Sequence, residues 1–132
     1  MAQKYIVNDI VMYKNRIHTI IDTLRLNNYE LSYVRHPVNQ AELSGVPLTP
    51  EILEKNGWSR EDGAFGVSPD FKKIIDDPAR KKGYITCLSA YPFFGNDGFS
   101  FFYNNQKLAV IHYVHELQHI LFGLNINHEM EV

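Results

Sequence analysis

The first 46 residues alternate between apolar and polar positions with the two-residue period of β-strands. The alternation runs through 10–13, 16–23 and 29–35, and Asn15 and Asn27 fall in the intervals between these stretches. Asparagine tolerates the left-handed backbone conformation that tight turns require. The pattern therefore predicts a meander of short antiparallel strands, which would form a small curled sheet of the SH3-like kind.

A short helix is predicted at 49–57. Thr49 can cap its N-terminus through the side-chain oxygen, and Gly57 can end it in the left-handed conformation. Trp58 follows directly, and we expect its large ring to pack on the core. The residues at 59–70 are rich in glycine and charge, which predicts a loop.

Strand-like residues return at 83–90 and 99–103 and continue after a turn at 104–105, so that 83–109 is predicted to be a β-hairpin region. A C-terminal amphipathic helix is predicted at 110–124, because apolar residues recur there at about 100° per residue. The apolar stripe consists of Val110, Tyr113, Val114, Leu117, Ile120, Leu121 and Leu124. We expect this stripe to pack on the sheet.

The composition fits a single domain of the α+β class, formed by residues 1–132. Of the 132 residues, 45% are hydrophobic, which is enough to bury a core without disulfides or a structural metal. A net charge of −2 leaves no broad positive surface for a nucleic-acid polymer. Cys87 is the single cysteine and cannot form an intramolecular disulfide. No apolar segment is long enough for a secretion signal or a membrane span, so we expect a soluble cytoplasmic protein.

One motif has the spacing of a zinc-peptidase signature: His115-Glu116-Leu117-Gln118-His119. In such enzymes two histidines four apart on a helix bind zinc, and the glutamate takes a proton from the metal-bound water. With Leu117 at the centre of the apolar stripe, His115 and His119 fall nearly opposite, and His112 lies close by. Three imidazoles are therefore predicted to share the outer face of the helix, turned away from the core.

Two interpretations of that face follow. In the first, it is an exposed polar surface that binds no metal, although its imidazoles could still contact a ligand. In the second, the chain is a minimal zinc hydrolase in which His115 and His119 bind the metal and Glu116 is the general base. A third ligand would have to come from His128 or Glu129, and neither has a spacing typical of such enzymes.

A second candidate site is the aromatic segment at 91–99. Aromatic rings beside small polar residues on a loop could stack on a planar ligand such as a nucleobase, with amide or carboxylate groups supplying hydrogen bonds. The candidate ligand-binding residues are Tyr91, Phe93, Phe94, Asn96 and Asp97. The alternative is a turn whose aromatic rings fold back on the core.

The chain resembles a group of small uncharacterised proteins encoded by phages and mobile elements of gut bacteria. The resemblance rests on the segment Pro-Leu-Thr-Pro-Glu-Ile-Leu-Glu-Lys-Asn-Gly at 47–57 and on a helix beginning Tyr-Val-His-x-Leu-Gln at 113–118. In that group the helix usually continues Asn-Leu, where this chain has His119-Ile120. The resemblance implies a phage or mobile-element origin, a bacterial host cell and no established activity.

These observations favour a non-enzymatic binding protein. Its partner would be a host protein or a small signalling ligand, such as a nucleotide used in bacterial immunity, which the protein would sequester. The alternatives are the zinc hydrolase and a virion or oligomeric structural module. No nucleic-acid polymer, membrane or cofactor is expected for the leading interpretation, and a homo-oligomer stays open.

Overall fold

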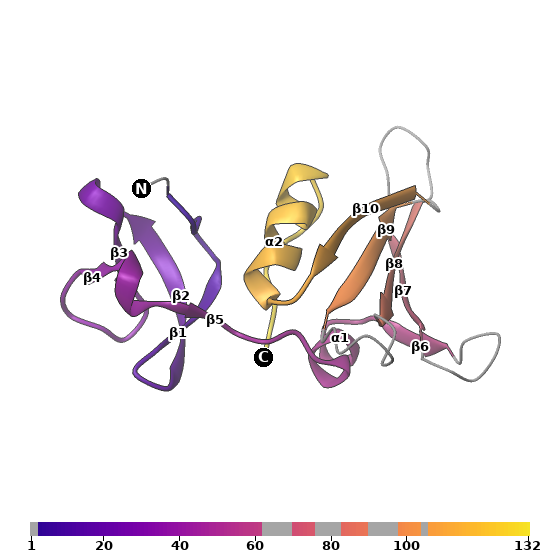
Figure 1. Cartoon of the computed structure of the whole chain (residues 1–132), viewed down its shortest axis with the longest axis horizontal. Helices are drawn as coiled ribbons and strands as arrows, with labels where there is room; N and C mark the ends of the chain where they lie inside the picture. The colour runs from indigo at the N-terminus through magenta and orange to yellow at the C-terminus, as the bar shows by residue number, and fades with distance from the viewer. Residues whose placement is uncertain (1–2, 62–69, 76–82, 90–97, 104–105) are drawn as a thin grey trace. The chain divides into compact units, whose positions relative to one another are not determined.

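The computed structural model describes residues 3–61, 70–75, 83–89, 98–103 and 106–132, and its fold class is α+β, as predicted (Figure 1). The chain divides into two compact units. Unit 1 comprises residues 1–47 and 113–130, and unit 2 comprises residues 48–112 and 131–132. Each unit is described by itself below. The assignment of the whole chain to a single domain stays a prediction.

Unit 1 contains the predicted meander. Its strands are β1 (Ile10–Tyr13), β2 (Arg16–Thr23), β3 (Asn28–Leu31), β4 (Val38–Asn39) and β5 (Ser44–Gly45). Their order in the sheet is β4-β3-β2-β1-β5, and all pairs are antiparallel (Figure 1). A 3-10 turn, η2 (Gln40–Glu42), connects β4 to β5. This strand order, with a 3-10 turn before the last strand, is that of an SH3-like barrel.

The long strand β2 is the central strand of this curled sheet. It pairs with β1 along one edge and with β3 along the other, and its pairing with β3 shifts register between Ile20 and Asp22. A bulge of this kind bends a strand and increases its twist, which curls the sheet. The β1–β2 turn places Lys14 at φ 48° and Asn15 at φ 63°. Both values are left-handed, as a tight hairpin turn requires.

The core of unit 1 follows the predicted alternation in β3, where Tyr29 and Leu31 are buried and Glu30 is exposed. The core is formed by Tyr5, Val11, Tyr13, Ile20, Tyr29, Leu31, Val38 and Leu43. The prediction that this strand reaches residue 35 was wrong. Tyr33 adopts φ 62° and is 99% exposed, so the strand ends at Leu31.

Unit 2 is a second antiparallel meander. Its strands are β6 (Ser59–Glu61), β7 (Asp70–Ile75), β8 (Gly83–Ser89), β9 (Phe99–Tyr103) and β10 (Gln106–Ile111), in the order β10-β9-β8-β7-β6. The prediction of a loop at 59–70 was therefore wrong at its first residues, because Arg60 pairs with Phe71 across β6 and β7.

The short helix α1 (Pro50–Lys55) is confirmed with its predicted ends. The Thr49 hydroxyl accepts a hydrogen bond from the Ile52 N–H at 3.3 Å, and Gly57 adopts φ 86°. Trp58 is buried, as expected, and its ring meets Phe101 edge to face.

The C-terminal helix α2 (Val114–Gly123) begins later than predicted. Ile111 still belongs to β10, where it pairs with Phe99 of β9. Backbone pairing with β9 therefore prevails over the helical period at 110–111. Within the described residues, no helix combines the length and the hydropathy needed to cross a membrane.

Candidate functional site

The zinc-like motif lies on α2, and its glutamate caps the N-terminus of that helix. The Glu116 carboxylate accepts a hydrogen bond from the backbone N–H of Tyr113 at 3.0 Å. Tyr113 is the N-cap residue and Glu116 is at the third helical position, where a carboxylate satisfies a backbone donor and faces the positive end of the helix dipole. Glu116 thus has a structural role in stabilising α2.

Gln118 connects α2 to the SH3-like strands through side-chain hydrogen bonds. Its side chain is fully buried and makes three hydrogen bonds to backbone groups. The side-chain oxygen accepts from the N–H of Ile10 at 2.9 Å, and the nitrogen donates to the carbonyls of Asn8 at 2.7 Å and His128 at 3.0 Å. Gln118 therefore joins the start of β1 to the segment that follows α2.

His119 pairs with a buried carboxylate. Its Nε2 lies 2.5 Å from Oδ2 of Asp9, a residue with 0% exposure, and the same oxygen accepts a hydrogen bond from the Ile6 N–H at 2.9 Å. The two side chains thus share one short hydrogen bond. The His119 side chain is 34% exposed, so solvent reaches it while Asp9 stays inside.

His115 is enclosed by aromatic rings. Its own ring stacks on Tyr113 with an interplanar angle of 10° and meets Tyr5 edge to face, with ring centroids 5.0 Å apart. Gly45 makes this stack fit, because a Cβ at that position would lie 2.6 Å from the Tyr113 ring. Burial lowers the pKa of His115, although the nearby Asp9 carboxylate acts in the opposite direction.

The buried residues Tyr5, Asp9, His115 and Gln118, together with the half-buried His119, form a polar cluster, which we call the α2 polar cluster. In the described part of the chain, three buried polar atoms lack a hydrogen-bond partner, and all three belong to it: Tyr5 Oη, Asp9 Oδ1 and His115 Nδ1. Burial is also the main cause that raises the pKa of Tyr5. The cluster is a compact polar interior within unit 1.

The prediction that His115 lies on the outer face of the helix was therefore wrong. His115 is 4% exposed and packs inside unit 1 with Gln118. The helical wheel weighed side-chain hydropathy alone, whereas Gln118 is buried because its amide satisfies backbone groups of Asn8 and Ile10. The polar face of α2 is thus part of its packing surface.

The third histidine of the predicted outer face and the candidate third zinc ligands have other surroundings. His112 follows β10 in unit 2, where its ring lies against Gly98. The His128 ring meets Phe122 edge to face, and Glu129 is exposed. Across the ranges that the structure describes, no three His, Cys, Asp or Glu side chains are grouped so as to hold a metal ion. The zinc hydrolase stays a prediction.

The aromatic candidates Tyr91, Phe93, Phe94, Asn96 and Asp97 lie outside the described residues. Their role in ligand binding therefore stays a prediction.

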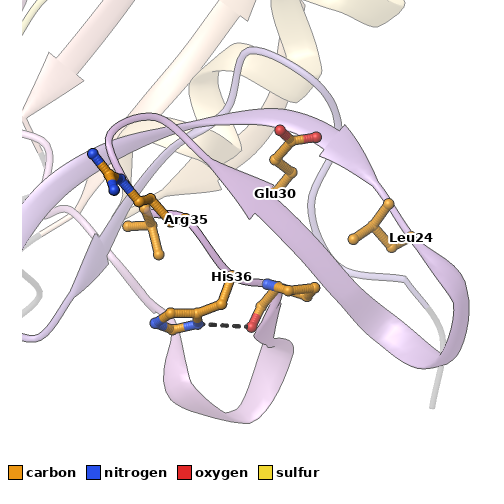
Figure 2. Close-up of a pocket in the computed structure, with 6 residues that line it drawn as sticks. Leu24, Glu30, Arg35 and His36 are labelled. Carbon is orange, nitrogen blue, oxygen red and sulfur yellow. Dashed lines mark hydrogen bonds between the residues drawn. The ribbon is translucent and has the colours of Figure 1, made fainter.

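A cavity on unit 1 was not foreseen from the sequence (Figure 2). It lies between the end of β2, the strand β3 and the segment that connects β3 to β4, and its volume is about 290 Å³. It is lined by Leu24, Glu30, Val34, Arg35, His36 and Pro37. Three of these side chains are apolar and three are polar, which is typical of a surface that recognises both shape and charge.

Two turn residues adjoin this lining in the chain. Leu26 is 87% exposed at φ 58°, and Tyr33 is 99% exposed at φ 62°. A left-handed backbone is uncommon for residues other than glycine, asparagine and aspartate, and an exposed Leu or Tyr there is rarer still. The sequence held one signal of this feature, because Leu26 is an apolar residue inside an otherwise polar turn.

No protein-family model, no curated protein and no solved structure matches this chain.

Proposed function

We propose that this chain is a non-enzymatic binding protein of phage or mobile-element origin, which acts in the cytoplasm of a bacterial host cell. Its SH3-like unit binds a host protein through the cavity beside β3, and the binding requires no cofactor. The observation that carries this proposal is the exposure of Leu26 and Tyr33 on the two turns that adjoin the cavity. Exposed apolar side chains that adjoin a hollow with apolar lining supply the kind of surface on which a protein partner packs.

Hydrogen bonds fix the backbone of the two turns from which these side chains project. The N–H of Leu24 donates to the Asn28 carbonyl at 2.8 Å and closes the turn that presents Leu26. The N–H of Val34 donates to the Leu31 carbonyl at 3.3 Å and closes the turn that presents Tyr33. Each left-handed residue costs about 1–3 kcal/mol of backbone strain, and such strain is concentrated at binding sites. A backbone that is already fixed in this way loses little conformational entropy when a partner binds.

The size of the cavity favours a protein partner over an enclosed small molecule. Pockets that enclose drug-sized ligands measure about 300–1,000 Å³, and this cavity of about 290 Å³ is at the lower limit. It suits one long side chain of a partner. The remaining contact area would come from Leu26 and Tyr33.

Photo-crosslinking in host cells tests the proposal. Tyr33 is replaced by p-benzoylphenylalanine, and adducts are identified by mass spectrometry after irradiation. We expect one dominant host-protein adduct. The control carries the same photoreactive residue at Phe122, which is 59% exposed on α2 of the same unit. Adducts that are equally abundant at both positions, or absent at Tyr33, would contradict binding at the cavity.

A nucleotide ligand is the second candidate, because Arg35 and His36 line the same cavity and both residue types bind phosphate groups. Calorimetry with cyclic nucleotides distinguishes the two candidates. Saturable nucleotide binding that is lost in Arg35→Gln would identify a nucleotide, and not a host protein, as the ligand of the cavity.

A further inference from the structure

We infer that the cavity beside β3 receives an arginine side chain of the protein partner. This inference rests on the proposed function, and it specifies the chemistry of the partner at the same site.

The charge at one wall of the cavity points to a cationic occupant. Glu30 lines the cavity and is exposed, and its cross-strand partner in the β2–β3 register is Asp22, a second exposed carboxylate. Like charges directly opposite one another in an antiparallel pair destabilise a sheet. A bound cation would remove this repulsion.

The positive residue in the lining does not neutralise this wall. Arg35 lines the same cavity, but its guanidinium lies apart from the Glu30 carboxylate (Figure 2). Within the described ranges, neither Glu30 nor Asp22 forms an ion pair. Asp22 accepts only a local hydrogen bond from the N–H of Thr23 at 2.8 Å. The Glu30 carboxylate thus remains available to a ligand.

The apolar part of the lining fits the stem of the same side chain. Leu24, Val34 and Pro37 line the cavity together with Glu30. Arginine packs its aliphatic stem on apolar surface while its head group reaches a carboxylate. Its planar guanidinium presents several donors in a fixed fork that matches the two oxygens of a carboxylate, which the compact ammonium group of lysine does less well. An arginine therefore matches both the apolar wall and the Glu30 carboxylate.

The test is an NMR titration of the full, ¹⁵N-labelled chain with two synthetic peptides. One peptide is acetyl-Leu-Pro-Arg-Leu-amide, and the other carries citrulline, a neutral isostere, in place of arginine. We expect saturable shifts of the Leu24, Glu30 and Val34 amides with the arginine peptide, and at least tenfold weaker binding of the citrulline peptide. Glu30→Gln should abolish this preference, and Glu54→Gln on α1 of unit 2 should leave it unchanged.

Equal binding of the two peptides, no binding of the arginine peptide, or a preference that survives in Glu30→Gln would overturn the inference. The photo-crosslink at Tyr33 is read independently of these peptides. If the host-protein adduct is observed but the arginine peptide is not preferred, the proposed function stands and the inference that the partner supplies an arginine is wrong. If the adduct itself is missing, the proposed function fails.

Discussion

The side-chain oxygen of Gln118 accepts a buried hydrogen bond from the backbone N–H of Ile10, although the two residues are 108 positions apart in the chain. Ile10 is the first residue of β1, and Gln118 is on α2. Through this bond the helix satisfies a backbone donor at the start of the SH3-like strands. The polar residues of the zinc-like motif are therefore engaged in building unit 1.

Gln118→Leu should destabilise the protein strongly. The substitution keeps the bulk of the side chain but leaves the Ile10 N–H buried without a partner and removes the hydrogen bonds to the Asn8 and His128 carbonyls. An unsatisfied buried group costs about 1–3 kcal/mol, so we expect a loss of about 3 kcal/mol in the free energy of unfolding. Urea denaturation followed by circular dichroism measures it. The exposed Gln106→Leu on β10 is the control, and an equal loss in both variants would argue against the role of Gln118.

Two glycines should respond to alanine in opposite directions. Gly45→Ala places a Cβ 2.6 Å from the Tyr113 ring and 2.9 Å from Cε1 of His115, so the stack must shift. We expect a loss of about 1–3 kcal/mol, as for other overpacked positions. Gly123→Ala meets nothing within 4 Å at the end of α2 and should gain up to about 1 kcal/mol from helix propensity. Thermal denaturation compares them, and a Gly45→Ala variant as stable as wild type would show that the stack is loose.

Two buried tyrosines should differ when their hydroxyls are removed. The Tyr29 hydroxyl donates to Oε1 of Gln40 at 2.6 Å and accepts from the N–H groups of Lys4 and Tyr5. Tyr29→Phe should therefore cost about 2 kcal/mol of stability. The Tyr5 hydroxyl is buried without a hydrogen-bond partner, so Tyr5→Phe should change stability by less than about 0.5 kcal/mol or increase it. Equal losses in chemical denaturation would mean that the Tyr5 hydroxyl is paired in solution.

Stability should fall as the pH drops below about 6.5 because of His115. Burial lowers the pKa of His115 in the folded protein, so the unfolded chain, with an imidazole pKa of about 6.5, takes up a proton first. The contribution of His115 is complete above pH of about 6.5 and is lost as the pH decreases towards the folded-state pKa. Urea denaturation at several pH values measures this dependence. His115→Phe should flatten it, whereas the exposed His36→Phe should not, and identical profiles in both variants would exclude His115 as its source.

Metal analysis examines the zinc interpretation. Since His119 pairs with Asp9 and Glu116 caps α2, we expect substoichiometric zinc in protein purified without an affinity tag. The zinc content should be unchanged in His119→Asn. Stoichiometric zinc in the wild type that disappears in this variant would revive the hydrolase.

Features defined by neighbours in sequence could be predicted. The helix α1 has its cap at Thr49 and its left-handed end at Gly57, and both signals are local. The SH3-like meander likewise follows from a two-residue period within short stretches. The partners of the zinc-like motif are distant in sequence: His119 and Asp9 are 110 residues apart. His115 likewise packs on Tyr5, near the other end of the chain. A helical wheel contains no information about such distant partners, and it therefore placed His115 on the outer face.

The cavity could not be predicted for a different reason. It depends on turns in which Leu26 and Tyr33 adopt a left-handed backbone that their residue types disfavour. The alternation of apolar and polar positions predicted a longer third strand through residue 35, which would have removed the turn at Tyr33. The surface that we propose to be functional is thus the place where local preference and the observed structure disagree, as expected for strained binding sites.

The most direct test of binding through the cavity compares two variants in the Tyr33 photo-crosslinking experiment. Leu24→Glu adds a charge to the apolar wall of the cavity, and Glu116→Gln alters the zinc-like motif while keeping a side chain that can cap α2. With melting temperatures confirming that both variants fold, we predict that the host-protein adduct is lost in Leu24→Glu and retained in Glu116→Gln. An adduct that survives in Leu24→Glu and disappears in Glu116→Gln would contradict the account.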